Sequence, residues 1–186
     1  MDDLYGQRCS HCHGHPVFTS QGTAVSFEFT GELMARILRD IFYKTFNVEE
    51  EIDEDLFLAT VRTFDRATDE GFGIRDRRDP EHDFYEQIRG NNEVFSAFRT
   101  HRMQNDIASQ LLDGKGKLKP FHRFEEDVQR IIGTYNTAWL ETEYDTAVIR
   151  AHQAADWRVF ERDGGILPNL RWMPTTSAEP DPVHAQ

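Results

Sequence analysis

Apolar residues recur at helical spacing through the middle of the chain. The first apolar stripe predicts a helix that begins after Thr30 and ends near Phe46. Its members are Leu33, Met34, Ile37, Leu38, Ile41 and Phe42. A second amphipathic helix is predicted to follow, with Asp53 as its N-cap and Gly71 or Gly73 at its end.

The next apolar pattern predicts a short helix and then a long one. Asp79 followed by Pro80 is a start signal for the short helix, which is expected to end near Arg89. Residues 90–92 are predicted to interrupt it, so that Asn92 caps the long helix. The apolar residues of this third long helix are Val94, Phe95, Phe98, Met103, Ile107 and Leu111.

A much longer helical pattern begins after Pro120 and continues to Phe160. This span is far longer than an average helix, which indicates a bent element or a strut against other helices or chains. We expect Gly133 to be the position of a kink. Gly164 and Gly165 are predicted to end the helix.

The two ends of the chain lack helical periodicity. A polar N-terminal arm, residues 1–30, contains one alternating run at residues 25–29 that fits a short strand. Residues 164–186 contain a second candidate strand at residues 168–173 and then a proline-rich tail. The predicted fold class is therefore mainly α, with several long helices in a helical domain at residues 31–163, a polar N-terminal arm and one or two short strands.

Composition narrows the functional classes. The 186 residues carry 21 lysines and arginines against 33 aspartates and glutamates, a formal net charge of −12, which disfavours a nucleic-acid-binding function for the chain as a whole. The 14 phenylalanines favour either a bulky core or apolar surface that binds a partner. No apolar stretch is long enough for a membrane span, and the first residues lack the features of a secretion signal, so we expect a cytosolic protein without membrane contact.

Residues 99–123 are the one locally basic region of this acidic chain. Within them, Lys115, Lys117 and Lys119 follow one another in a glycine-containing turn. Such a turn can contact DNA or the acidic surface of a partner, but a solubilising loop is the simpler interpretation.

The sharpest local motif lies in the N-terminal arm. Cys9, Cys12, His13 and His15 have the residue types of a tetrahedral zinc site, although four ligands within seven residues are crowded and no second CxxC motif occurs. The CxxCH spacing also matches c-type haem attachment, which the absence of a secretion signal disfavours. The alternatives left open are therefore a zinc site and a reduced arm without metal.

Candidate catalytic patterns are weak, and we predict a protein that is not an enzyme. The sequence contains no GxSxG motif and no Walker-type phosphate loop. Neighbouring carboxylates such as Glu141 and Glu143 do not share a helix face. A cysteine nucleophile would require an accessible thiol with a perturbed pKa.

Four segments resemble the Mu-like phage minor head proteins, also called head morphogenesis proteins, and the Bacteroidetes-type members in particular. The segments are NEVFSAF at residues 92–98, LLDGKGKLKPFHRFEEDV at 111–128, YNTAWLETEYDTAVIRAHQAADW at 135–157 and ILPNLRW at 166–172. The resemblance covers roughly residues 31–184, and residues 135–157 are its most specific part.

This resemblance implies a virion structural protein that acts in head morphogenesis at the portal vertex, with a further role in DNA packaging or delivery. The implied partners are the portal protein and capsid or other head proteins within an oligomeric assembly. The implied location is the virion, and the host cytoplasm during assembly. Residues 175–182 lack the arginines that the family has after its strand, so we expect the small C-terminal α/β part of the family to be missing from this chain.

Aromatic residues on the predicted helices are candidate interface anchors. We single out Phe95, Phe98, Trp139 and Tyr144, for which a position in the core is the alternative. A different class of function also remains open at this point, namely a small zinc-binding regulatory or adaptor protein that acts through residues 9–15.

Overall fold

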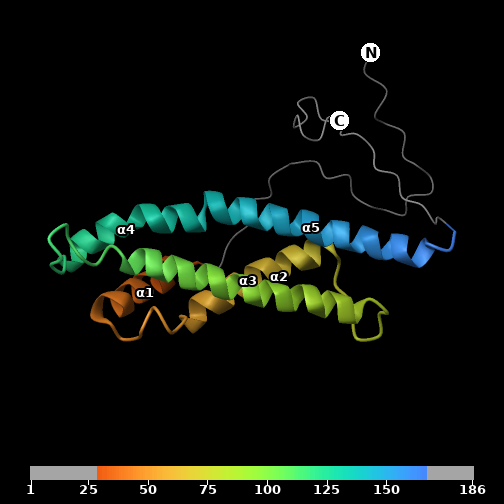
Figure 1. The fold of residues 1–186 in the computed structure, drawn as a ribbon, viewed down its shortest axis with the longest axis horizontal. Helices are drawn as coiled ribbons and strands as arrows, with labels where there is room; N and C mark the ends of the chain where they lie inside the picture. Colours follow the sequence, from red (N-terminus) through yellow and green to blue (C-terminus); the bar gives the residue numbers. More distant parts are fainter. Residues whose placement is uncertain (1–28, 167–186) are drawn as a thin grey trace, which may run out of the picture.

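A computed structural model describes residues 29–166, and within this part the fold is mainly α (Figure 1). The described residues form five helices and no named strand; Leu112 and Leu118 make one isolated antiparallel bridge. Both predicted strands fall wholly or almost wholly outside the described residues. None of the described helices is long and apolar enough to cross a membrane. The helices are α1 (Gly31–Tyr43), α2 (Glu54–Gly71), α3 (His82–Ala108), α4 (Phe121–Asn136) and α5 (Ala138–Asp163).

The structure confirms the predicted starts of α1 and α2, and Asp53 is the N-cap of α2 as predicted. The Thr30 hydroxyl oxygen accepts a hydrogen bond from the Leu33 N–H at 3.2 Å, and the Asp53 carboxylate accepts one from the Leu56 N–H at 2.9 Å. α1 ends three residues before the predicted Phe46. Lys44 adopts a left-handed backbone conformation there, with a φ of 54°, and closes the last turn.

The predicted interruption at residues 90–92 is wrong, because α3 is one continuous helix. Asn92 does not cap a helix; its side-chain amide donates to Asp65 Oδ1 at 3.1 Å and to Thr68 Oγ1 at 2.9 Å, both on α2. One turn earlier, Arg89 donates to Asp65 Oδ2 at 2.8 Å. Gly90 lies inside α3, where a glycine costs roughly 1 kcal/mol, and these hydrogen bonds to α2 offset that cost. The helix begins at His82, two residues after Pro80.

The predicted long helix after Pro120 is divided into α4 and α5 at Thr137, four residues beyond the expected kink at Gly133. The Tyr135 carbonyl accepts a hydrogen bond from the guanidinium of Arg99 on α3. In an uninterrupted helix this carbonyl would accept from the Trp139 N–H. A buried side chain on another helix therefore takes the acceptor that the continuous helix needs. The end of α5 at Asp163, with Gly164 as C-cap, agrees with the prediction.

The main core occupies one end of an elongated body (Figure 1), where α1, the end of α3 and α4 meet the first turn of α2. Its buried residues are Met34, Ile37, Leu38, Ile41, Leu56, Met103, Ile107, Phe124, Val128 and Tyr135. In the other half, α2 packs against both α3 and α5. The buried clusters there are small, one around Tyr144 and Val148 and one around Phe72 and Tyr85.

Three buried tyrosines connect neighbouring helices through hydrogen bonds to carboxylates. The Tyr85 hydroxyl donates to Asp69 at 2.5 Å, the Tyr135 hydroxyl to Asp106 at 2.6 Å and the Tyr144 hydroxyl to Glu70 at 2.8 Å. Burial, and then the hydrogen bond to the carboxylate, raises the pKa of Tyr85 and of Tyr135 to about 12. The same causes raise the pKa of Tyr144.

These pKa shifts predict that the fold loses stability in alkaline solution. An unfolded tyrosine has a pKa of about 10, so the unfolded chain releases its protons first as the pH rises from about 10 to 12, and the free energy of unfolding falls. We expect a loss of up to about 1.4 kcal/mol per pH unit for each tyrosine in this window, and full retention of this contribution below pH 10. Urea unfolding at several pH values measures this decline in the free energy of unfolding. Each single Tyr→Phe variant at positions 85, 135 and 144 should flatten the decline; an unchanged slope in all three would contradict the assignment.

Candidate functional site

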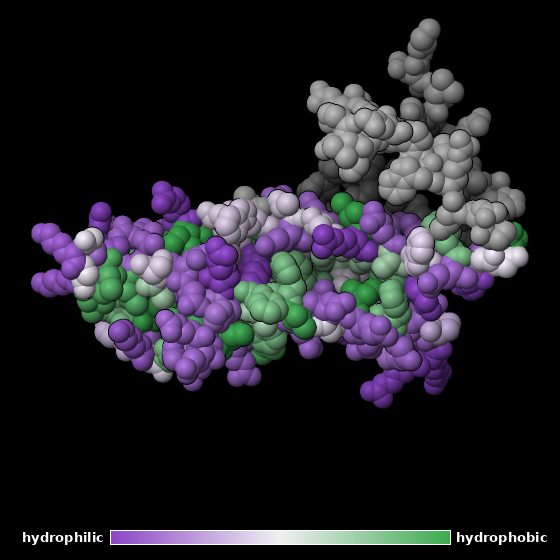
Figure 2. Space-filling view, viewed as in Figure 1, coloured by the Kyte–Doolittle hydropathy of each residue, from purple (hydrophilic) through white to green (hydrophobic). Residues whose placement is uncertain are grey.

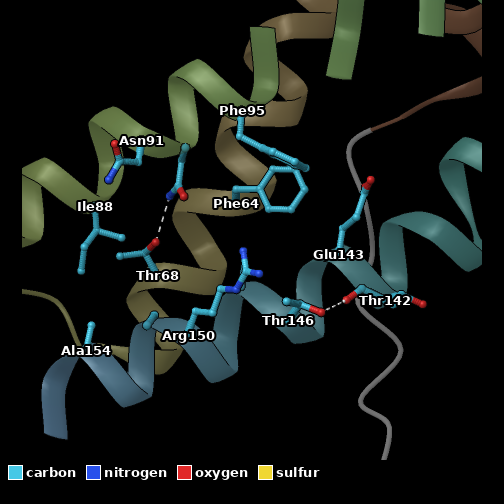
Figure 3. A pocket seen from close by; sticks show the side chains of 13 residues that line it. Phe64, Thr68, Ile88, Asn91, Phe95, Thr142, Glu143, Thr146, Arg150 and Ala154 are labelled. Atoms are coloured by element: carbon cyan, nitrogen blue, oxygen red, sulfur yellow. Dashed lines mark hydrogen bonds between the residues drawn. The ribbon is translucent and has the colours of Figure 1, made fainter. Parts of the chain in front are cut away.

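A groove separates α3 from α5 in the half of the molecule with the small cores. Two ion pairs mark its ends: Arg99 Nε lies 2.6 Å from Glu143 Oε2, and Arg158 Nε lies 2.5 Å from the Oε2 atom of Glu81, just before α3. Between these points lies a cavity of about 460 Å³, open to solvent on one side. Figure 3 shows that α2 lies beneath it and that α3 and α5 form its two walls.

The lining of the groove is mainly apolar or small. Phe64 and Thr68 of α2 form the floor, and Ile88, Asn91 and Phe95 belong to the α3 wall (Figure 3). Small side chains dominate the α5 wall, namely Thr142, Thr146, Ala147, Ala151 and Ala154. Because these side chains are short, the surface of α5 is shallow enough for another backbone to approach it closely.

Apolar residues surround the groove on the surface. Trp139 and Trp157 on α5 are about half exposed, at 49% and 52%. Their positions differ by eighteen residues, which is five helical turns, so both lie on the helix face that also contains Thr146 and Arg150. On α3, Phe98 is 73% exposed. Figure 2 shows apolar (green) surface among the polar (purple) surface of the body.

Arg150 is the charged residue of the groove lining that forms no ion pair with another residue in the described part of the chain. Its side chain is exposed and extends from α5 towards the space between α5 and α3 (Figure 3). Glu143, the other charged residue of the lining, is paired with Arg99. The groove therefore presents an apolar surface with one available cation.

Arg99 forms the buried end of the groove and joins three helices. Its side chain is only 2% exposed, while that of its partner Glu143 is 28% exposed. Besides Glu143, the guanidinium donates to the Tyr135 carbonyl, lies over the Tyr135 ring and faces the ring of Phe29 at 6.0 Å. Nη1 of Arg99 is buried without a hydrogen-bond partner among residues 29–166.

The structure places three of the four candidate anchors at the surface. Phe95, Phe98 and Trp139 are 44%, 73% and 49% exposed, and Phe95 is part of the groove wall. Tyr144 is 3% exposed and donates to Glu70, so its expected role as a surface anchor is corrected to one in the core. Its position on α5 turns it towards α2, which the sequence alone does not show.

Sequence reasoning missed Arg150 and the small residues around it. The signal that was available is the repeat of tryptophans at positions 139 and 157 with alanines and threonines between them on one helix face. This pattern marks an apolar face but does not tell whether another helix of the same chain covers it. The separation of α3 from α5 supplies that information.

The lysine turn lies between α3 and α4, away from the groove (Figure 1). Asp113 organises it by accepting hydrogen bonds from the N–H groups of Lys117 and Lys115, which lowers the pKa of this carboxyl. Lys119 Nζ lies 2.9 Å from Asp127 Oδ2, whose pKa it lowers. Lys115 and Lys117 remain exposed.

The predicted zinc ligands Cys9, Cys12, His13 and His15 lie outside the described residues. Among residues 29–166, no three His, Cys, Asp or Glu side chains are grouped so that they could hold a metal ion. The zinc hypothesis therefore stays a prediction about the N-terminal arm.

Comparison with known proteins gives no match: no family model, no curated protein and no solved structure matches this chain.

Proposed function

We propose that this protein is a virion structural component, a phage minor head protein that acts in head morphogenesis at the portal vertex. One observation carries the proposal. Residues 135–157 are the segment that most specifically resembles this family. The same segment forms the α5 wall of the open groove and contains the two exposed tryptophans of α5, Trp139 and Trp157. The residues behind the resemblance thus coincide with surface that is suited to bind a partner.

The shape and surface of the molecule support an assembly role. The body is elongated, so it can contact more than one neighbour (Figure 1). Eight of the fifteen exposed large apolar residues in the described part of the chain lie on α3 and α5, and the exposed Lys115 and Lys117 lie in the turn between α3 and α4. In this proposal the apolar groove binds a head protein such as the portal protein, and the lysine turn contacts an acidic neighbour or packaged DNA.

Purified particles of the phage or prophage that encodes the chain provide the test. We expect mass spectrometry to detect the chain in these particles together with the portal protein, and deletion of its gene to abolish DNA-filled heads. Expression of the chain from a plasmid should restore filled heads, which excludes an effect of the deletion on neighbouring genes. Absence of the chain from particles, with normal head formation after the deletion, would overturn the proposal.

A further inference from the structure

The half of the molecule that contains the groove has the arrangement of a four-helix bundle with one position empty. α2 packs against α3 on one side and against α5 on the other. α3 and α5 therefore occupy diagonal positions, and the groove lies at the position opposite α2. At the other end of the body, α1, α2, α3 and α4 all contribute side chains to the main core.

We propose that this groove binds an α-helix supplied by another protein, with an apolar face and a carboxylate that pairs with Arg150. The α5 wall runs from Thr142 to Ala154, a rise of about 18 Å, or more than three turns of a docked helix. Its small side chains permit the helix–helix distance of about 8–10 Å that close packing requires. The apolar side chains of the docked helix then contact Phe64 and Phe95.

The charge of the groove defines the chemistry of the docked helix. The whole chain is strongly acidic, and a basic partner is the simplest expectation for most of its surface. Within the groove, however, Glu143 is already paired, and Arg150 is the cation that points into the cavity (Figure 3). A carboxylate near the middle of the docked helix would form a charge-assisted hydrogen bond with Arg150 in partly dehydrated surroundings.

The sequence favours a helix from another molecule over a segment of this chain. Residues 1–28 have no helical periodicity, and residues 167–186 are interrupted by Pro168, Pro174, Pro180 and Pro182. The helices of the described part already pack against one another. This inference rests on the proposed function in one respect: the proposed function identifies the protein that supplies the helix as a head protein.

A pair of synthetic helical peptides tests the proposal with the full chain. Each is a capped peptide of about 18 residues with leucine and alanine on one face, stapled on the other, and labelled with a fluorophore. They differ at one central position of the apolar face, which is glutamate in one and glutamine in the other. By fluorescence anisotropy we expect one-to-one, saturable binding, with the glutamate peptide bound about 3- to 10-fold more tightly, as for a pair worth about 1 kcal/mol.

Variants of the chain separate docking in the groove from binding elsewhere. Arg150→Gln should abolish the difference in affinity between the two peptides. Arg130→Gln changes an exposed arginine on α4, outside the groove, and should preserve this difference. Thr146→Trp and Asn91→Trp fill the groove from its two walls and should each weaken both peptides at least tenfold. Far-UV circular dichroism and thermal unfolding verify that the variants are folded; two filling positions on different helices keep the test valid if one variant unfolds.

Several outcomes would overturn the proposal. These are equal binding of the two peptides, binding that Thr146→Trp and Asn91→Trp leave unchanged, or self-association of the chain through the groove in analytical ultracentrifugation. Binding that appears only after residues 167–186 are deleted would assign the groove to this chain's own C-terminal segment. Detection of the chain in purified particles, combined with failure of the peptides, would leave the proposed function in place and remove only the helix-docking inference.

Discussion

Replacement of Glu143 by leucine is expected to lower the free energy of unfolding by about 3–5 kcal/mol. The reason is the asymmetry of its ion pair with Arg99. The arginine side chain is 2% exposed, so without its partner it becomes an uncompensated charge that water does not reach, while Glu143 is 28% exposed. Arg99→Met leaves the more exposed Glu143 without its partner, and should therefore lower the free energy of unfolding by less, about 1–3 kcal/mol. Urea unfolding followed by far-UV circular dichroism measures both losses.

The double variant Arg99→Met/Glu143→Leu removes both charges and should recover much of the stability lost in Glu143→Leu, because an apolar pair carries no desolvation cost. Glu141→Leu is the matched control, since Glu141 is exposed on the same helix, and we expect a change within about 0.5 kcal/mol. A loss below about 1 kcal/mol in Glu143→Leu would show that this ion pair does not compensate the buried arginine.

Replacement of Gly71 by alanine is expected to lower the free energy of unfolding by about 1–3 kcal/mol or more, because the added methyl group has no space between α2 and α5. A Cβ atom at this position would lie 2.3 Å from the Val148 carbonyl oxygen and 2.8 Å from the Ala151 Cβ. The nearest obstacle is backbone, which cannot rotate away as a side chain can, so the two helices must separate. Thermal unfolding measures the effect as a lower Tm, by about 2–4 °C for each kcal/mol.

Gly90→Ala is the matched control for this substitution. Gly90 lies inside α3, and an added Cβ would meet no atom within 4 Å. Alanine there should raise stability by about 0.5–1 kcal/mol, because the backbone of glycine loses more freedom on folding. If Gly71→Ala is also neutral or stabilising, then α2 and α5 do not pack as closely as the structure has them.

Local sequence signals predicted the helix termini well wherever the cap belongs to the helix itself. Thr30 and Asp53 cap α1 and α2 through their own side chains, and Gly164 follows the last residue of α5. These signals act within one helical turn, so no distant contact is needed to form them. The mainly α fold follows from the same kind of evidence, the spacing of apolar residues.

The errors occur where a residue on another helix competes with the local signal. Asn92 reads as a cap in the sequence, but its amide binds Asp65 and Thr68 on α2 and α3 continues through it. Conversely, the pattern from Phe121 to Phe160 is helical throughout, yet Arg99 takes the Tyr135 carbonyl and the helix divides at Thr137. In each case the hydrogen-bonding partner is more than twenty residues away.

The sequence by itself determined the helical content, most helix boundaries, the acidic charge and the presence of aromatic residues such as Phe95 and Trp139 on amphipathic helices. Only the tertiary structure decided which of these residues are covered. Tyr144 and Trp139 lie on one helix, but α2 covers the first and leaves the second half exposed. The groove beside Arg150 exists because α2 holds α3 and α5 on either side of itself. Helical periodicity specifies the apolar face of one helix, whereas a groove depends on the distance between two.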